Sequence, residues 1–555
     1  MQRSIVCLLG AALVAVGSLA LSPGRPGLAA DGVERGKPLA PVDAARMIDA
    51  VLADELASES GGSSPAQTVD DESYLRRVSQ DLVGELPNPA EITAFVLDPA
   101  ADKRAKIVAR LLADPRYGEN WAHYFRDVIL YRRTDERALL AGQSITEFLS
   151  KQLNSGAGWD QIARSFITAK GDVRENGSTG LFMAQMGQAP EIAAETARIF
   201  LGIQIQCAQC HDHKTDRWKR RQFHELAAFF PRVAIRPVRD GERRSFEVVS
   251  RDATPKKPPK NGKPRGTAEY YMPDLDDPSA KGTLTTPAFF LTGQKLPEGT
   301  KDADRRKALA DWITDKSNPW FARALVNRLW AELVGHGFYD PLDDMGPDRT
   351  AIAPRTLDLL ASKFVEHGYD LRWLLGTIMA TERYQRHSRS PADGTAAHFA
   401  ANCPQALRAD QVFASLTSAL AIDERQLVPP GPPGPQKMRR GPRAEFDRTF
   451  GYDPSDPRDE ITASIPQALL MMNAPLLARA INGRNAGTVL GKLLAAESDD
   501  ETVVTELYLR CLAREPRPEE LAACLSYARS TADRAEAFED LLWALVNTTE
   551  FTHRK

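Results

Sequence analysis

Apolar residues recur along most of the chain with the period of α-helices, and strictly alternating stretches are rare. After Asp71, apolar side chains return every three or four residues and so fall on one face of a helix. The positions on that face are Tyr74, Leu75, Val78 and Leu82. A later stretch repeats the pattern every four residues, at Phe321, Leu325, Leu329 and Leu333. These periods predict a mainly α-helical protein.

Helix ends are marked by residues that satisfy free backbone groups. Asn88, Pro89 and Glu91 predict a helix start, because they supply an N-cap, a proline at the first position and a glutamate at the third. Another helix begins near Pro190 and stops near Gly202. Further helices are predicted over residues 44–56, 103–112, 121–131, 144–153, 159–168, 356–367, 371–381, 409–419, 466–473, 502–512, 518–529 and 535–547.

Strand patterns are confined to the middle of the chain. Short alternating stretches within residues 233–250 predict strands, and a basic, proline-rich stretch follows at 254–265. The fold class we expect is therefore mainly α, with two helical domains joined by a short β-containing, Pro/Lys-rich segment. The first domain is predicted over residues 44–250, the linker with short strands over 251–301, and the second domain over 302–553.

The first thirty residues resemble a targeting segment. Arg3 precedes an apolar run from Ile5 to Leu21, and Leu28-Ala29-Ala30 is an acceptable cleavage site. We therefore expect a signal peptide over residues 1–30 and an exported protein, in the periplasm or outside the cell. The apolar run is long for a signal core, so an uncleaved N-terminal membrane anchor stays open as the alternative.

The composition, and the absence of common catalytic motifs, exclude several classes of function. The chain has 71 Lys and Arg against 74 Asp and Glu, and a net charge of −3 argues against general nucleic-acid binding. It has no phosphate-binding glycine loop, no Gly-x-Ser-x-Gly elbow and no His-Glu-x-x-His motif. We find no hydrolase, kinase or dehydrogenase signature, and the sequence does not place the protein among enzymes.

The strongest chemical signal is Cys207-Ala208-Gln209-Cys210-His211. Two cysteines separated by two residues and followed at once by histidine form the attachment signature of c-type haem. In this interpretation Cys207 and Cys210 bind the porphyrin covalently and His211 ligates the iron. The competing interpretation is a structural zinc site that adds His213 and His224 to the same cysteines. A redox-active dithiol ranks third, since the strand–helix context of thioredoxins is missing.

The second axial position of such a haem needs another residue. Met272, within Tyr270-Tyr271-Met272-Pro273, lies in a setting that resembles small cytochromes, and methionine there would raise the reduction potential. The competing interpretation of Met272 is a packed strand residue.

Three other groups of residues each have two alternative interpretations. Cys511 and Cys524 flank a predicted helical hairpin and either form a disulfide or remain two buried thiols. The acidic segment 340–347 either binds calcium or a sugar, or is a solvated turn. Aromatic residues after the cysteine motif either wall a macrocycle or form an ordinary core; they are Trp218, Phe223, Phe229 and Phe230.

Longer motifs resemble a pair of known families. Residues 200–214 and Asp114-Pro115-Arg116-Tyr117-Gly118-Glu119-Asn120-Trp121 are similar to the planctomycete cytochrome-c-like (PSCyt-type) domain of unknown function. Residues 311–314, 318–323, 326–330, 462–468 and 543–547 resemble its usual companion, the PSD-type domain of unknown function.

The resemblance implies an exported protein that occurs with haem-binding or carbohydrate-related modules. Together with the Cys207 motif, it leads us to expect an exported c-type haem-binding protein with an electron-transfer or redox role. The alternative is a zinc-stapled extracellular module associated with polysaccharide handling. The expected partners are a redox protein or other exported modules, with no nucleic acid and no membrane unless the N-terminal segment stays uncleaved.

Overall fold

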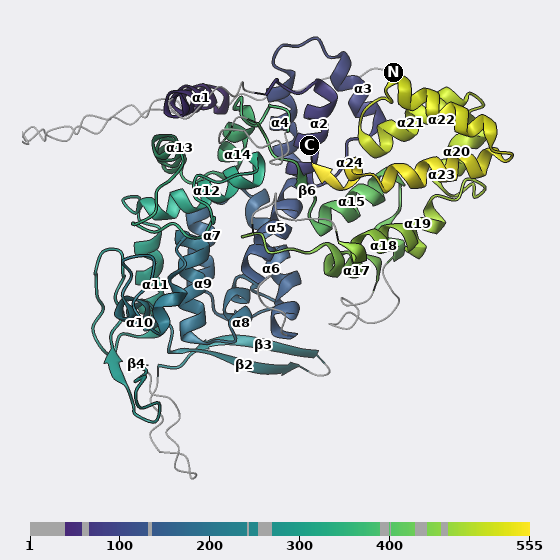
Figure 1. Ribbon diagram of the computed structural model, residues 1–555. Coiled ribbons are helices and arrows are strands. Elements are labelled where there is room, and N and C mark those ends of the chain that lie inside the picture. The colour runs from purple at the N-terminus through teal and green to yellow at the C-terminus, as the bar shows by residue number, and fades with distance from the viewer. Residues whose placement is uncertain are drawn as a thin grey trace, which may run out of the picture. The chain divides into compact units, whose positions relative to one another are not determined.

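Helices form the bulk of the computed structural model, which describes residues 39–57, 66–130, 136–240, 243–252, 269–388, 399, 401–427, 441–456 and 464–554 (Figure 1). The predicted signal peptide, the whole basic, proline-rich stretch 254–265 and residues 58–65 lie outside the described residues. Within them, the mainly α fold class is confirmed.

The N-terminal half contributes ten α-helices and two short 3₁₀ helices to the described part of the chain. Their bounds are α1 Pro41–Leu56, α2 Asp71–Val83, α3 Pro89–Leu97, α4 Lys103–Ala113, α5 Pro115–Leu130, α6 Glu136–Asn154, α7 Trp159–Ile167, η1 Gly177–Thr179, α8 Gly180–Ala184, α9 Ala189–Leu201, η2 Ile205–Gln209 and α10 Arg220–Ala227.

The C-terminal half is also helical. Its elements are α11 Asp302–Ile313, α12 Pro319–Val334, α13 Pro354–Glu366, α14 Leu371–Ala380, α15 Ala409–Ala419, η4 Glu424–Leu427, α17 Pro442–Phe450, α18 Ile465–Asn473, α19 Pro475–Ala480, α20 Val489–Ala496, α21 Asp500–Leu512, α22 Pro518–Ser530, α23 Arg534–Val546 and α24 Thr549–Thr552.

Local chemistry sets several helix ends as the sequence predicted. The Asn88 side chain accepts a hydrogen bond from the Glu91 amide at 3.0 Å, and the Glu91 carboxylate accepts one from the Asn88 amide at 3.1 Å. This reciprocal pair satisfies two free donors at the start of α3. At the other end of α9, Gly202 takes a left-handed conformation with φ 67° and ends the helix as expected.

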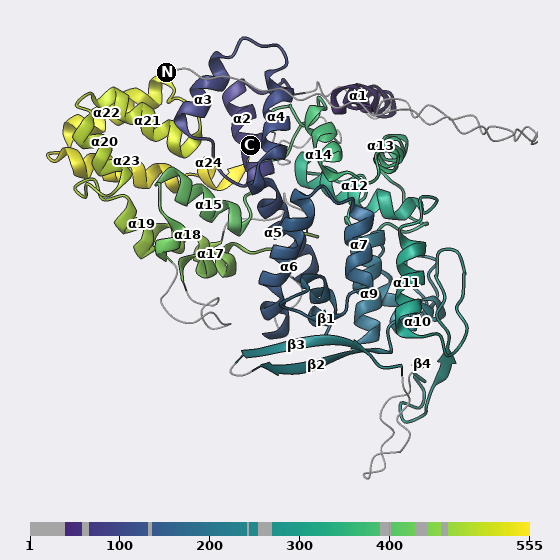
Figure 2. The same ribbon diagram turned by 180° about the vertical axis from the view of Figure 1, so that it is seen from behind.

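Strands are few and short. β1 (Gly171–Asp172), β2 (Val233–Asp240) and β3 (Arg243–Ser250) form one antiparallel sheet in the order β1-β3-β2, which Figure 2 shows from behind. The β2–β3 pairing runs from Val233 opposite Ser250 to Asp240 opposite Arg243, so the strands expected within 233–250 are confirmed. Two smaller pairs are β4 (Tyr270–Met272) with β5 (Thr283–Thr285) and β6 (Gln405–Ala406) with β7 (His553–Arg554).

The two predicted helical segments pack on each other. α9 contacts α12, α7 contacts α11, and α1 contacts both α13 and α14. Residues Leu39–Lys555 accordingly form one compact unit with a continuous hydrophobic core. Among the described residues, no helix is both long and apolar enough to cross a membrane.

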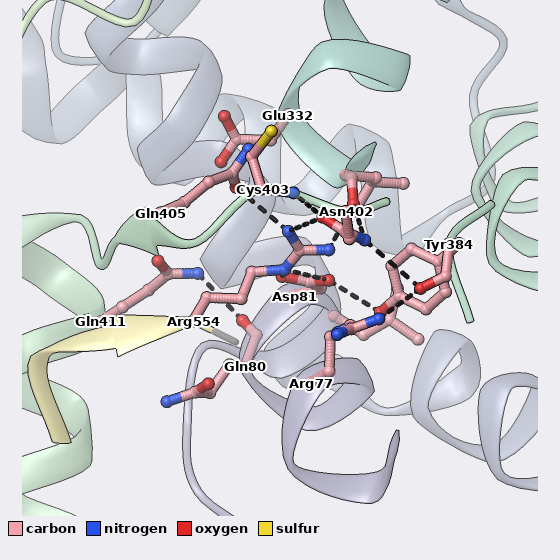
Figure 3. A network of polar contacts seen from close by, with 12 residues as sticks. Arg77, Gln80, Asp81, Glu332, Tyr384, Asn402, Cys403, Gln405, Gln411 and Arg554 are labelled. Atoms are coloured by element: carbon pink, nitrogen blue, oxygen red, sulfur yellow. Dashed lines mark hydrogen bonds and ion pairs between the residues drawn. The ribbon is translucent and has the colours of Figure 1, made fainter. Parts of the chain in front are cut away.

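The end of the chain returns to the core through a buried polar network (Figure 3). Arg554 is 3% exposed, and its guanidinium lies 2.8 Å from the Asp81 carboxylate. The same guanidinium donates to the side-chain oxygens of Asn402 at 3.3 Å and Gln405 at 3.2 Å. The Tyr384 hydroxyl donates to Asp81 at 2.7 Å. The network therefore joins Arg554, near the end of the chain, to residues that lie far from it in the sequence.

Cys403, Cys511 and Cys524 form no disulfide within the described part of the chain. Cys403 and Cys511 are buried, and Cys524 is half-buried. Burial raises the pKa of the Cys511 thiol to about 12, so this sulfur stays protonated and behaves as a small apolar group. Of the two alternatives for Cys511 and Cys524, the structure has the pair of unbridged thiols.

Candidate functional site

The cysteine motif leaves a buried helix and turns outward. All residues from Thr196 to Leu201 at the end of α9 are buried, and the chain reverses at Gly202. A Cβ atom at Gly202 would lie 2.6 Å from the Met345 sulfur, so only glycine allows this close approach. Three residues later, at Ile205, the chain enters η2, which carries Cys207. The helix and its glycine stop fix where the motif begins.

The three haem-signature residues all face solvent. Cys207 and Cys210 are exposed free thiols, and His211 is exposed as well. Ile205 and Ala208, on the opposite side of the same turn, are buried and anchor it. The structure therefore places both sulfurs and the imidazole on the accessible side of one short segment.

His211 has a defined tautomer. Its Nδ1 atom lies 2.8 Å from the main-chain carbonyl oxygen of Asp212. Because a carbonyl oxygen only accepts, Nδ1 must carry the proton and donate. In the neutral form of the ring the lone pair is then on Nε2, which is the arrangement found in metal-ligating histidines.

The loop after the motif is closed by its own polar groups. The Asp212 carboxylate accepts a hydrogen bond from the Arg220 amide at 2.9 Å and pairs with Lys219 at 3.1 Å. The hydrogen bond from the Arg220 amide, followed by that from Lys219, lowers the pKa of Asp212. The His213 amide donates to the Trp218 carbonyl oxygen at 2.8 Å, and the His213 ring accepts a long bond of 3.4 Å from Thr215. This closure holds the residues around His211 in place.

His224 occupies a structural position beside the motif. The ring is 1% exposed, and its Nε2 atom donates to the Gln209 carbonyl oxygen at 3.0 Å. Its Nδ1 atom accepts from the Tyr270 hydroxyl, also at 3.0 Å. Both ring nitrogens are thus engaged with protein atoms, so the His224 contribution expected for zinc would require breaking two hydrogen bonds. Burial lowers the pKa of His224, which keeps the ring neutral.

Met272 lies in strand β4, close to the motif in the fold. The strand is connected to the motif through Tyr270, which reaches His224, and through Arg220. The Arg220 guanidinium donates to the carbonyl oxygens of Gln209 at 3.3 Å and Pro273 at 2.6 Å. Met272 is half-buried and pairs with Thr283 across the β4–β5 ladder.

The aromatic residues after the motif belong to the core. Trp218, Phe223, Phe229 and Phe230 are all buried. The Trp218 ring packs edge-on against Phe290 at 5.1 Å, and the Phe229 ring against Trp312 at 5.7 Å. The alternative of an ordinary aromatic core is therefore the one that the structure has.

The acidic segment 340–347 contacts the end of α9, directly before the cysteine motif. The Met345 amide donates to the Gly202 carbonyl oxygen at 2.8 Å, directly at the end of α9. Asp343 is buried and forms ion pairs with Arg198, at 3.0 Å, and with Arg328. Although burial alone raises it, the two arginines lower the pKa of Asp343 to about 2. The calcium or sugar site suggested for this segment is therefore wrong for Asp343, whose carboxylate is committed to arginine.

A second contact joins the motif loop to the same segment. Arg217 pairs with Asp348 at 2.7 Å, and Arg349 donates to the Thr215 hydroxyl at 3.0 Å. Asp216, between them, packs so tightly on Gly346 that a Cβ there would lie 1.4 Å from a carboxylate oxygen. These partners could not be recognised from the sequence, because they are more than 120 residues apart and carry no shared motif.

Within the described residues, no three His, Cys, Asp or Glu side chains lie close enough together to hold one metal ion. The four sulfur and nitrogen ligands that the zinc interpretation requires are thus not brought together in the structure. The haem interpretation requires fewer protein groups, since only two thiols and one imidazole must meet the porphyrin.

Two family models match the chain. Residues 47–234 match PSCyt2, a protein family of unknown function (DUF1549), and residues 305–445 match PSD1, another protein family of unknown function (DUF1553). No curated protein and no solved structure matches the chain.

Proposed function

The chain carries a PSCyt2 domain followed by a PSD1 domain, and on this basis we propose that it is an exported protein that binds c-type haem through Cys207, Cys210 and His211. Cysteines 207 and 210 supply the two thioether bonds, and His211 is the proximal iron ligand. When bound, the haem supplies a one-electron redox centre, which gives the protein an electron-transfer role.

The observation that carries the proposal is the hydrogen bond from His211 Nδ1 to the Asp212 carbonyl oxygen at 2.8 Å. It directs the free lone pair of the ring to Nε2, the atom that ligates iron in such centres. The exposed free thiols on the same turn complete the set.

Met272 is our candidate for the opposite iron ligand. Side chains at i and i+2 of a strand point to the same face, so Met272 shares the face of Tyr270, which contacts His224 beside the motif. His213 is a weaker candidate, because its Nδ1 atom already accepts from the Thr215 amide. A methionine ligand raises the reduction potential and suits a partner that accepts or donates electrons outside the cytoplasm.

Structural zinc is the competing function. It uses Cys207, Cys210 and two of His211, His213 and His224. The two hydrogen bonds of His224 weigh against it, since a zinc ligand must offer one ring nitrogen to the metal. We therefore favour haem, and treat zinc, with a role in an extracellular polysaccharide-associated assembly, as the alternative outcome.

The test is production of the full chain in a host that exports proteins and attaches c-type haem. The purified protein is then denatured, separated on a gel and stained for haem. We expect a stained band and a Soret absorption, both lost in a Cys207→Ser, Cys210→Ser double variant. Cys524→Ser, which removes a thiol far along the chain from the motif, is the matched control and should retain the stain.

A colourless wild-type protein of unmodified mass, made in that host, overturns the haem proposal. Stoichiometric zinc in such a protein supports the alternative.

A further inference from the structure

The two candidate iron ligands belong to segments that are separate in the sequence. His211 follows η2, whereas Met272 is the last residue of β4. Both side chains can bind one iron ion only if the two segments are held at a fixed separation. The residue that contacts both segments is Arg220, the first residue of α10.

The Arg220 side chain bridges the two segments directly. Its Nε atom donates to the carbonyl oxygen of Gln209, the residue before Cys210, at 3.3 Å. A terminal nitrogen of the same guanidinium donates to the carbonyl oxygen of Pro273 at 2.6 Å. Pro273 directly follows Met272. Because the guanidinium group is planar and rigid, it holds the two carbonyl groups at one separation.

The backbone of Arg220 is fixed on the motif loop. Its amide donates to the carboxylate of Asp212, the residue after His211, at 2.9 Å. α10 itself contacts both η2 and β4, and Figure 1 shows α10 and β4 side by side. The bridge to β4 therefore starts from a position that the motif itself sets.

The other end of the bridge lies in a tight hairpin. Met272 pairs with Thr283 across the β4–β5 ladder. A Cβ atom at Gly282, where φ is 76°, would lie 2.2 Å from the Met272 carbonyl oxygen. The hairpin thus fixes the backbone of Met272 internally, and contacts with α10 decide where the hairpin lies relative to the motif.

The contacts of α10 with the chain after β5 do not involve Arg220. The Gln222 side chain donates to the Phe290 carbonyl oxygen at 3.2 Å, and the Ala288 amide donates to the Glu225 carbonyl oxygen at 3.2 Å. These contacts remain when Arg220 is replaced, so we expect the region to stay folded on α10.

We infer, on the basis of the proposed haem function, that Arg220 is a positioning residue that holds β4 where Met272 can ligate the iron. With the bridge intact, the methionine competes well for the second axial position. Without it, β4 can move away from the motif, and a small external ligand reaches that position more easily. A residue that only stabilised the fold would change the free energy of unfolding and leave the axial ligand as it was.

The experiment is a carbon monoxide titration of the reduced, haem-loaded full chain, with a redox titration of the same samples. We expect Arg220→Gln to bind carbon monoxide about tenfold more tightly than wild type, because glutamine cannot bridge both carbonyl groups. Its reduction potential should fall, as expected for Met272→Ala. Arg221→Gln is the matched control and should change neither value. Arg221 is 70% exposed and pairs with Glu225 of its own helix at 2.9 Å.

Two further variants separate positioning from folding. Arg220→Gln combined with Met272→Ala should bind carbon monoxide no more tightly than Met272→Ala alone, because both changes free the same axial position. Arg220→Lys keeps the charge but not the rigid fork, and its affinity should lie between wild type and Arg220→Gln. Thermal unfolding checks every variant. If Arg220→Gln fails to fold, Arg220→Lys still tests the bridge.

The results distinguish this inference from the haem proposal. Folded, haem-loaded Arg220→Gln with the carbon monoxide affinity and potential of wild type overturns the role of Arg220 and leaves the haem proposal standing. The same holds if Met272→Ala binds carbon monoxide as wild type does, or if the effects of the double variant are additive. A wild-type chain that carries no haem overturns both.

Discussion

The Nε2 atom of His224 donates a hydrogen bond to the main-chain carbonyl oxygen of Gln209 at 3.0 Å. This bond joins the first turn-and-a-half of α10 to the residue directly before Cys210. Since the same carbonyl oxygen also accepts from Arg220, the backbone of the motif is held from two sides. His224 therefore positions the motif, and the two interpretations of the motif predict different consequences when it is removed.

His224→Ala should destabilise the protein without preventing haem attachment. The change removes one of the two hydrogen bonds to the Gln209 carbonyl oxygen and leaves the Tyr270 hydroxyl without its acceptor, which costs about 1–3 kcal/mol for a buried group. Chemical denaturation measures the loss, and haem staining should match wild type. Tyr270→Phe, which removes only the second bond, is the milder control. Loss of bound zinc from an otherwise folded His224→Ala protein would instead support the zinc alternative.

Met272→Ala should lower the reduction potential of the haem protein. Methionine ligation raises the potential, and axial ligands together span roughly 0.8 V, so a shift on the order of 0.1 V is expected when the sulfur is lost. A redox titration followed by absorbance measures it. Met186→Ala is the control, because Met186 is exposed and lies outside the motif and β4. An unchanged potential in Met272→Ala would mean that another residue occupies the second axial position.

Asp447→Asn should stabilise the protein at neutral pH. Burial raises the pKa of Asp447 to about 6 from its ordinary value of 3.8, so between these pH values the folded chain binds more protons than the unfolded chain. The free energy of unfolding then falls as the pH rises from about 4 to about 6. Above pH 6 the wild type carries the full cost of an ionised buried carboxylate, and asparagine removes about 1–3 kcal/mol of that cost.

Urea denaturation at pH 7.5 and pH 4 measures this difference. The gain should appear at pH 7.5 and vanish at pH 4, where Asp447 holds its proton in the folded state. Glu445→Gln on the same helix should change neither value. If Asp447→Asn is less stable than wild type at pH 7.5, the Asp447 carboxylate stabilises the fold and the prediction is wrong. If the variant is more stable, the protein keeps Asp447 although it lowers the free energy of unfolding.

Features set by neighbouring residues could be predicted from the sequence. The start of α3 follows from Asn88 and Glu91, three residues apart, and the end of α9 from the left-handed preference of Gly202. The β2–β3 pairing likewise follows from alternation within 233–250. In each case the physical cause lies within one turn or one hairpin, so the sequence alone contains it.

Features that depend on partners far away in the sequence could not be predicted from it. His224 looked available for a metal because Tyr270, 46 residues later, cannot be recognised as its partner from the sequence. Asp343 looked like part of an acidic binding loop because Arg198 lies 145 residues earlier.

Asp81 and Arg554 offer the sharpest test of such a distant pairing. Both are buried, and 473 residues separate them. Burial raises the pKa of Asp81 even against the opposing effects of Arg554 and Tyr384, so the carboxylate depends on its partner to remain charged. Arg554→Met leaves that carboxylate without its cation and should cost about 3–5 kcal/mol.

The double variant Asp81→Asn, Arg554→Met removes both charges and should recover part of the loss, because no unpaired buried charge remains. Chemical denaturation of the two single variants and the double variant gives the coupling. The exposed pair Asp102 and Lys106, 2.7 Å apart, is the comparison, and its cycle should show no measurable coupling at physiological salt. Additive losses at Asp81 and Arg554 would instead mean that the two buried charges do not stabilise each other across the network in Figure 3.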